Sequence, residues 1–223
     1  MRPYYEQDGI VLYHGDAREV LPHLGRADLL LTDPPYGIDG GRGGGNTARG
    51  KGLYEHTGWE DTPAYIGDVV IPVVREALAH VERGIVMPGK PHMNIYPEPA
   101  DIGAMWTPAG LGFGSWGRSV FSPILYYGRD PRAGVGQVPT GKQVTEGPFS
   151  REHPCAKPLH FWQWLMAKGS LDGETVLDPF CGAGTTLRAA KNLGRKAIGI
   201  EIEERHCELA VRMLAQQSMG LGL

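Results

Sequence analysis

Apolar positions along this chain fall into short runs that alternate with stretches of helical spacing. Runs typical of strands cover residues 9–13, 27–32, 84–87, 120–127, 175–178 and 197–201. Apolar residues three and four positions apart, typical of helices, cover residues 17–24, 62–81, 158–166, 185–193 and 203–216. This alternation predicts the α/β class, with a doubly wound and mostly parallel sheet.

Single residues refine these elements. The run at 27–32 is almost continuously apolar, as expected for a strand that is covered on both faces. Pro123 near the start of the run at 120–127 predicts an edge strand, because proline cannot donate to a sheet ladder. The inner face of the last helix is expected to consist of Leu209, Val211 and Met213.

The segments between these elements are rich in glycine and proline. Residues 37–58 are expected to form a flexible Gly-rich loop, since a loop of this length is either functional or disordered. Residues 88–117 are interpreted as irregular, and residues 129–150 as a second polar loop. A chain of 223 residues suits a single domain, 1–223, with a small appendage.

Charge and cysteine content narrow the classes of protein. The net charge of −3 is not typical of a nucleic-acid-binding protein, so any positive surface has to be local. The three cysteines, Cys155, Cys181 and Cys207, have neither metal-binding nor disulfide-framework spacing, which fits a reducing cytoplasm and predicts no metal site. No apolar run is long enough for a membrane span, and the N-terminus lacks a signal core. We therefore expect a cytoplasmic protein.

One stretch, Thr175 to Thr186, combines a strand ending at Asp178 with a glycine turn and a helix start. Gly182 and Gly184 allow a sharp turn that exposes backbone N–H groups at the helix N-terminus, which favours a negative or polar ligand group. Glu201 ends the next strand, where its carboxylate can accept ribose hydroxyls. This order is typical of a nucleotide-binding βαβ unit.

A second motif, Asp33-Pro-Pro-Tyr36, follows the strand at 27–32. Together with Asp178-Pro-Phe-Cys-Gly-Ala-Gly-Thr-Thr186, it resembles the motifs of the S-adenosylmethionine-dependent amino-methyltransferases of DNA. The catalytic motif precedes the cofactor motif, an order similar to that of the circularly permuted beta class. The resemblance implies a Rossmann-like methyltransferase fold, circularly permuted, with a small irregular insert. The target-recognition region would lie within 88–150, which is short for the family.

The resemblance assigns catalysis to Asp33, Pro34, Pro35 and Tyr36. An exocyclic amine is a poor nucleophile because its lone pair is delocalised into the ring. The Asp33 carboxylate and the Pro34 carbonyl would accept its two hydrogens and turn its lone pair toward the methyl group. Pro35 stiffens the turn, and Tyr36 offers a face for an extruded base.

The resemblance also implies the cofactor site, and S-adenosylhomocysteine as the product. The methionine and ribose portions would contact Asp33, Asp178, Phe180, Cys181, Gly182, Gly184, Thr185 and Thr186. Glu201 would bind the ribose hydroxyls, and Asp16 would lie by the adenine. Their neighbours Ala17 and Ile202 are also expected to bind the cofactor. His153, Lys157 and Pro158 match a family stretch of the form HPxxKP that would close over the methionine end.

Three of these residues also have structural interpretations. Asp16 precedes Ala17 as an ordinary helix N-cap would. Lys157 can equally be a solvated lysine near a helix start, and Cys181 a small buried filler. These alternatives stay open at the level of sequence.

Two other motifs are weaker. Residues 45–52 approach a phosphate-binding P-loop, but Gly52 replaces the magnesium-binding Ser or Thr and no strand precedes the loop. The Gly-rich loop at 37–58 would instead offer Arg42, Arg49 and Lys51 to phosphates. Pro154-Cys155 is similar to the nucleophile of cytosine ring-carbon methyltransferases, whose chain order differs and which lack the Asp-Pro-Pro-Tyr motif.

A local basic patch provides candidate DNA contacts. Between residues 118 and 142, Arg118, Arg129, Arg132 and Lys142 face a single acid, Asp130. Phosphate binding by this patch is a hypothesis.

The sequence thus predicts a site-specific DNA methyltransferase that acts on N6 of adenine in double-stranded DNA. Adenine is favoured because adenine enzymes of the family mostly carry Asp or Asn at the first motif position, whereas N4-cytosine enzymes mostly carry Ser. Cytosine, an RNA or protein amino-methyltransferase, and a catalytically silent nucleic-acid-binding module stay open as alternatives. Family members often dimerise, so a homodimer is compatible, and a restriction partner cannot be inferred.

Overall fold

A computed structural model describes residues 1–37, 61–108, 113–114, 116–133, 139–144 and 157–216. Within this part, nine strands form one sheet in the order β1-β2-β11-β10-β3-β4-β8-β5-β9. They are β1 (Tyr5–Gln7), β2 (Ile10–His14), β3 (Leu29–Thr32), β4 (Arg83–Val86), β5 (Asp101–Trp106), β8 (Phe121–Tyr127), β9 (Lys142–Gln143), β10 (Thr175–Asp178) and β11 (Lys196–Glu201). A separate hairpin pairs β6 (Phe113–Gly114) with β7 (Gly117–Arg118).

The centre of the sheet is parallel. Strands β2, β11, β10, β3 and β4 pair in parallel, whereas β1 and β8 run antiparallel to their neighbours. This confirms the predicted α/β class and its mostly parallel sheet.

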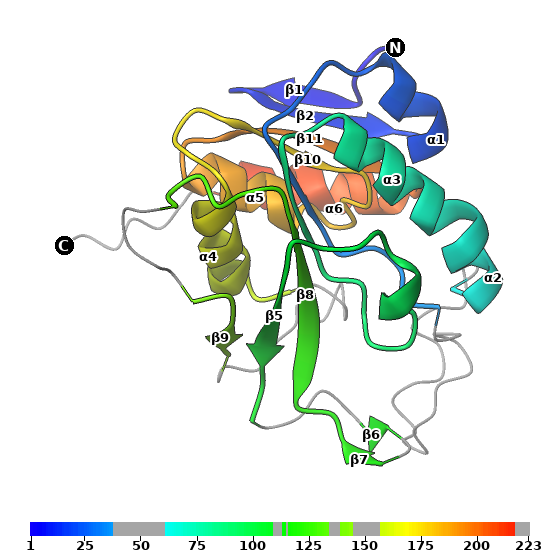
Figure 1. The fold of residues 1–223 in the computed structure, drawn as a ribbon. Coiled ribbons are helices and arrows are strands. Elements are labelled where there is room, and N and C mark those ends of the chain that lie inside the picture. The colour runs from blue at the N-terminus through cyan, green and yellow to red at the C-terminus, as the bar shows by residue number, and fades with distance from the viewer. Residues whose placement is uncertain (38–60, 109–112, 115, 134–138, 145–156, 217–223) are drawn as a thin grey trace.

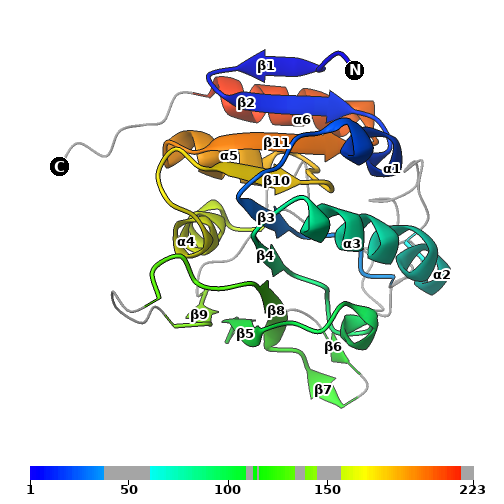
Figure 2. The same ribbon diagram turned by 45° about the horizontal axis from the view of Figure 1, so that its top comes forward.

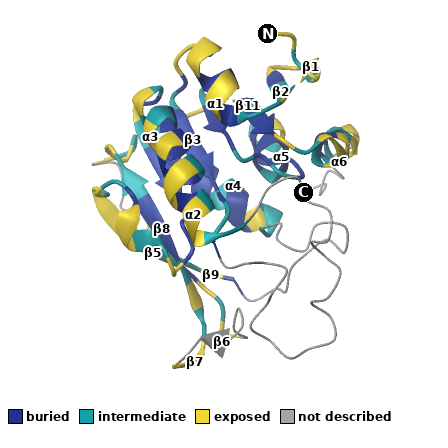
Figure 3. Cartoon of the chain, turned by 90° about the vertical axis from the view of Figure 1, so that its right-hand side faces the viewer, coloured by how far each residue is buried: buried dark blue, intermediate teal, exposed yellow. Residues whose placement is uncertain are grey.

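Helices cover both faces of the sheet (Figure 2). They are α1 (Ala17–Val20), α2 (Pro63–Tyr65), α3 (Ile71–Ala79), α4 (Leu159–Gly169), α5 (Thr185–Asn192) and α6 (Glu204–Ala215), with short 3-10 turns at Leu21–His23 and Met93–Ile95 and a π segment at Ile66–Val70 joining α2 to α3. Leu29 and Leu31 of β3 pack toward α4, α5 and α6, and Leu30 packs toward α1 and α3. Successive side chains of a strand point to opposite faces, so the apolar run buries both. Figure 3 shows the resulting pattern of buried strands beneath helices with exposed outer sides.

Two sequence-based expectations are wrong. The strand at 120–127 is not an edge strand, because β8 lies between β4 and β5. Pro123 is tolerated there because it pairs only with Ala104 of β5, in a part of β8 that has no partner on β4. The segment 88–117 is not wholly irregular either, because it contains the six-residue strand β5.

The phase of the last helix also differs from expectation. Its buried residues are Cys207, Ala210 and Leu214, spaced three and four positions apart, rather than Leu209 and Met213. Val211 packs partly against the same core. The small side chain of Ala210 lets α6 approach the glycine turn before α5, as described below.

The strand order reverses between β3 and β10, which run parallel to each other. From β3 the chain crosses to its neighbour β4 on one side, and from β10 it crosses to β11 on the other. Ligands of open α/β sheets bind outside the carboxyl ends of the strands at such a switch point. The carboxyl ends of β3 and β10 carry Asp33 and Asp178.

An antiparallel ribbon of β5 and β8 extends past this carboxyl edge. Val86, the last residue of β4, pairs with Leu125, so the first residues of β8 lie beyond the end of β4. Trp106 and Phe121 pair at the end of the ribbon, and the β6–β7 hairpin lies further out in the same direction (Figure 1). None of the helices in the described ranges has both the length and the hydropathy that a membrane span requires.

Candidate active site

The Asp33 carboxylate is held by two donors. Tyr36 Oη donates to Asp33 Oδ1 at 2.5 Å, and Lys157 Nζ donates to Asp33 Oδ2. Lys157 Nζ also donates to Tyr36 Oη at 3.0 Å and lies 5.2 Å from the centroid of the Tyr36 ring. Pro34 is buried and Pro35 is half-buried, so the Asp-Pro-Pro-Tyr turn is packed and its functional groups are oriented.

Residues distant in sequence support this turn. Gly89 has φ +67°, and a Cβ built there would lie 2.6 Å from Cγ of the Tyr36 ring. Gly37 N donates to Asp61 Oδ1 at 2.5 Å, and His92 Nε2 lies 3.4 Å from the Gly37 carbonyl oxygen. These supporting contacts are not among the features expected from the sequence. Pro88-Gly89 marks a turn in the sequence, but nothing local indicates which ring packs on it.

The Asp178 carboxylate is buried and fully engaged within the chain. It is 2% exposed and accepts from Thr32 Oγ1 at 2.7 Å, from Thr186 Oγ1 at 2.5 Å and from Phe180 N at 3.1 Å. Burial raises its pKa to about 6, although these hydrogen bonds act in the opposite direction. Trp162 Nε1 donates to Thr186 Oγ1 at 2.7 Å and completes the network. Asp178 therefore anchors the glycine turn from inside.

The glycine turn leads into α5 without a side-chain cap. Gly182 and Gly184 have φ values of +54° and +85°, and Gly184 is the N-cap residue. A Cβ at Gly184 would lie 2.7 Å from Cβ of Ala210, so glycine is required both by the backbone and by the packing of α6. The first N–H groups of an uncapped helix are available to a negative or polar ligand group.

Cys181 behaves as a structural residue. Its side chain is 6% exposed, its backbone N–H donates to the Ile200 carbonyl at 3.0 Å, and burial raises the pKa of its thiol. A Cβ at Gly199 would lie 2.8 Å from Cys181 Sγ, so the sulfur fills the space over β11. This supports the filler interpretation.

Glu201 joins β11 to the glycine turn. Its Oε2 accepts from Gly182 N at 2.7 Å, its Oε1 accepts from Glu203 N at 2.9 Å, and His206 Nδ1 lies 3.6 Å from Oε1. The residue is 7% exposed. Carboxylate oxygens have about four lone-pair sites in total, so Glu201 retains acceptor capacity.

Asp16 is an N-cap in this structure. Its Oδ1 accepts from Arg18 N at 2.9 Å, and the Arg18 guanidinium binds the same carboxylate and lowers its pKa. The preceding Gly15 N donates to the Glu201 carbonyl at 2.9 Å, which brings Asp16 beside the end of β11. Ala17 is buried in α1, and Ile202 is 40% exposed.

The structure thus brings those predicted cofactor and catalytic residues that it describes to one edge of the sheet. Lys157 lies at the same edge because its Nζ donates to Asp33 Oδ2, and the next residue, Pro158, is the N-cap residue of α4. His153, Arg42, Arg49 and Lys51 lie outside the described residues. In the part of the chain that the structure describes, no group of three or more His, Cys, Asp or Glu side chains could hold a metal ion.

The cations of the predicted basic patch are divided between the two ends of the strands, the carboxyl edge that carries Asp33 and the opposite edge. Arg118 lies in β7 and Lys142 in β9, on the side of Asp33. Arg129 follows the other end of β8 and lines a cavity of about 660 Å³ at the opposite edge. Arg132 lies nearby, where its guanidinium donates to the carbonyls of Ala167 and Ser170 at the end of α4. These four cations do not form one surface.

Comparisons with known proteins point to one family. The N6_N4_Mtase family model, described as DNA methylase, matches residues 93–212, more than half of the chain. Type II methyltransferase M.ScaI of Streptomyces caespitosus is 26% identical to this chain over an alignment of 276 residues, gaps included. The alignment covers 99% of this chain and 86% of that protein.

Solved structures show the same fold. The crystal structure of an M1.HpyAVI–SAM complex superposes with a TM-score of 0.67 at 18% identity, covering 92% of this chain and 98% of that one. PvuII DNA methyltransferase, a cytosine-N4-specific enzyme, superposes with a TM-score of 0.66 at 15% identity, covering 97% of this chain and 96% of that one. At these identities the likeness concerns the fold alone.

Proposed function

Because the chain belongs to the N6/N4 DNA methylase family, we propose that it transfers a methyl group from S-adenosylmethionine to N6 of adenine in DNA. One observation carries this proposal. The Asp33-Pro-Pro-Tyr36 turn and the glycine turn after Asp178 flank the switch point of the sheet, and Thr32 Oγ1 joins them by its 2.7 Å hydrogen bond to Asp178 Oδ1. Catalytic and cofactor motifs of the family type are therefore parts of one site.

The residues of the glycine turn fit this cofactor. The uncapped N-terminus of α5 suits the carboxylate or other polar groups of an amino-acid moiety. Glu201 has the remaining acceptor capacity that ribose hydroxyls need, while its existing bonds keep the turn in place. When bound, S-adenosylmethionine supplies an electrophilic methyl group on a positively charged sulfur.

The catalytic turn would activate the amine by orientation and hydrogen bonding. Asp33 and the Pro34 carbonyl would accept the two amine hydrogens and direct the nitrogen lone pair toward the methyl group. Tyr36 is fixed by its bond to Asp33 and by packing on Gly89, so its ring can hold a base in one orientation. The presence of Asp at position 33 supports adenine over cytosine.

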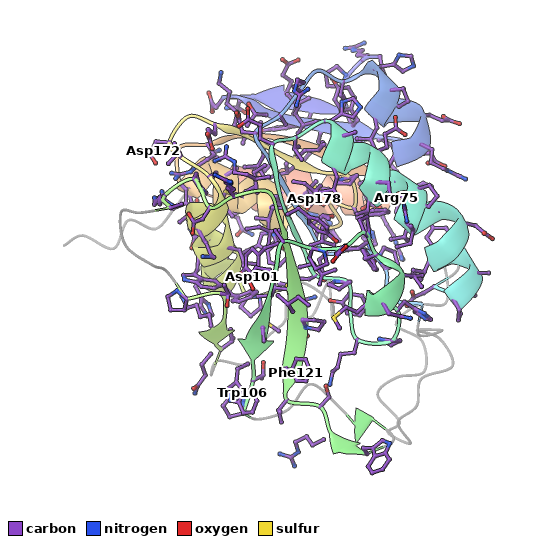
Figure 4. The ribbon with its side chains drawn as sticks, in the orientation of Figure 1. Arg75, Asp101, Trp106, Phe121, Asp172 and Asp178 are labelled. Atoms are coloured by element: carbon purple, nitrogen blue, oxygen red, sulfur yellow. The ribbon has the colours of Figure 1, made fainter. Side chains whose placement is uncertain are left out.

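The DNA would lie along the carboxyl edge and the projecting ribbon. Trp106 and Phe121 are a cross-strand pair, 45% and 40% exposed, and Lys90 Nζ lies 4.5 Å from the centroid of the Phe121 ring. Both aromatic residues lie at the end of the ribbon, near the hairpin that carries the fully exposed Trp116 (Figure 4). Exposed aromatic faces with neighbouring cations suit stacking on bases and contact with phosphates.

The test uses methyl-labelled S-adenosylmethionine and unmethylated mixed-sequence duplex DNA, followed by digestion and nucleoside analysis. Labelled N6-methyladenine nucleoside is the expected product. Labelled N4-methylcytosine nucleoside would show that the methylated base is cytosine and not adenine, and would leave the proposed methyl transfer to DNA intact. If no label enters the DNA although calorimetry shows that the cofactor binds, the proposal that this chain alone methylates DNA is wrong.

A further inference from the structure

A single lysine interacts with both functional groups of the catalytic turn. Lys157 Nζ donates to Asp33 Oδ2 and, at 3.0 Å, to Tyr36 Oη, and it lies 5.2 Å from the Tyr36 ring centroid. The side chains of Lys157 and Asp33 are only 12% and 20% exposed. The ammonium is therefore held in a poorly solvated position, where charge interactions are stronger than at the surface.

The proposed reaction brings positive charge, first on the cofactor sulfur and then on the amine nitrogen, to the place that the Lys157 ammonium occupies beside Asp33. The amine lone pair forms the new C–N bond while the C–S electron pair returns to sulfur, which becomes a neutral thioether. The nitrogen becomes cationic until it loses a proton. If Asp33 binds the amine, two cations would share one carboxylate unless the lysine withdraws.

We propose, on the basis of the proposed function, that Lys157 is an internal counter-cation of Asp33 that binding of the charged cofactor displaces. Lys157 is then a positioning residue: it holds Asp33 and Tyr36 in the resting state and disfavours a positive ligand relative to a neutral one. The protein should therefore bind S-adenosylmethionine less tightly, relative to S-adenosylhomocysteine, than it would without the lysine charge.

The structure allows the lysine side chain to move by itself. Lys157 precedes Pro158, the N-cap residue of α4, so it lies outside the helical hydrogen bonds. The helix is fixed by buried Phe161, Trp162 and Leu165. Rotation within the lysine stem can thus release Asp33 without a shift of the helix.

The experiment measures the dissociation constants of both ligands by calorimetry in the wild-type protein and in Lys157→Gln. The ratio Kd(S-adenosylmethionine)/Kd(S-adenosylhomocysteine) is expected to fall by about tenfold in the variant, the effect of one like charge removed from a partly buried site. Lys157→Arg, which keeps the charge, should retain the wild-type ratio. Lys196→Gln, an exposed lysine at the far end of β11, is the matched control.

The other outcomes are distinct. Equal weakening of both ligands would mean that Lys157 binds a group that they share, and an unchanged ratio would mean that it has only a structural role. Either result overturns the inference and leaves the proposed function intact. If the wild-type protein binds neither ligand, the proposed function itself fails. If Lys157→Gln does not fold, Lys157→Met preserves the apolar stem and carries the same expectation.

Discussion

The hydroxyl of Thr32 donates a 2.7 Å hydrogen bond to Asp178 Oδ1, across 146 positions of sequence. Thr32 immediately precedes Asp33, and Asp178 begins the glycine turn. The bond joins β3 to β10 at the point where the strand order reverses, so a buried contact sets the two motifs relative to each other. Any displacement of one strand end would change the distance between the proposed catalytic carboxylate and the proposed cofactor turn.

Replacing Thr32 by Val should destabilise the protein by about 1–3 kcal/mol, because it removes a donor from a buried carboxylate. The free energy of unfolding in urea measures this. Thr32→Ser keeps the hydroxyl and should lie much closer to the wild-type value. A larger loss in Thr32→Ser than in Thr32→Val would show that packing of the Thr32 methyl group, and not the hydrogen bond, is what matters.

The stability of the protein should respond to the ionisation of Asp178, whose pKa burial raises from 3.8 to about 6. Between these values the folded state binds more protons than the unfolded state, so the free energy of unfolding falls as pH rises. The change is on the order of 2 to 3 kcal/mol, at roughly 1.4 kcal/mol per pKa unit. Above about pH 6 this contribution is constant.

Comparison with Asp178→Asn isolates this effect, since the amide does not titrate. Urea unfolding at several pH values should show the wild-type protein losing stability relative to the variant across that window. Parallel stability curves for the two proteins would contradict the raised pKa.

Asp33→Ala should reduce methyl transfer by at least about 100-fold, because the change removes a preorganised hydrogen-bond acceptor for the reacting amine. Turnover is measured with labelled cofactor and duplex DNA. Exposed Asp68 provides the matched control, and Asp68→Ala should retain wild-type turnover. A rate near wild type in Asp33→Ala would exclude the proposed role of this carboxylate.

Gly89→Ala should impair catalysis through Tyr36. The added Cβ would lie 2.6 Å from the Tyr36 ring and would push the ring from Asp33. A displacement of about 1 Å can lower a rate on the order of 100-fold. Gly173→Ala is the control for backbone strain, because Gly173 has φ +79° but its added Cβ has nothing within 4 Å. Similar losses of activity in the two variants would mean that strain, and not the collision, is responsible.

DNA affinity should depend on cations at the Asp33 edge. Charge reversal at exposed Lys90 and Arg118 should weaken binding and reduce the slope of log K against log salt by about two, as expected for two lost phosphate contacts. Reversal at Arg75 and Arg129 changes the net charge equally and should leave the slope unchanged. A reduced slope in the second pair alone would place the DNA at the opposite edge and support the sequence-based assignment of Arg129.

The sequence by itself determined the central parallel strands, the helices that follow them in the chain, and the two motifs. The apolar run 27–32 is followed by the carboxylate of Asp33, and the run 175–178 ends in that of Asp178. The glycines at 182 and 184 adopt the positive φ values that the turn requires. These features depend on side-chain polarity and backbone freedom within a few residues, so they can be read locally. The roles of the site residues and the expected loop at 37–58 stay predictions.

Only the tertiary structure decided which distant groups meet. Lys157 binds Asp33 across 124 positions, Gly89 packs on Tyr36, and Arg129 lies at the edge opposite Asp33. Each outcome depends on strand order, because pairing decides which end of one strand lies beside another. The run of cations from Arg118 to Lys142 looks continuous in sequence, yet β8 lies within it. This strand runs from the edge that carries Asp33 to the opposite edge, so Arg118 lies before it at one edge and Arg129 after it at the other.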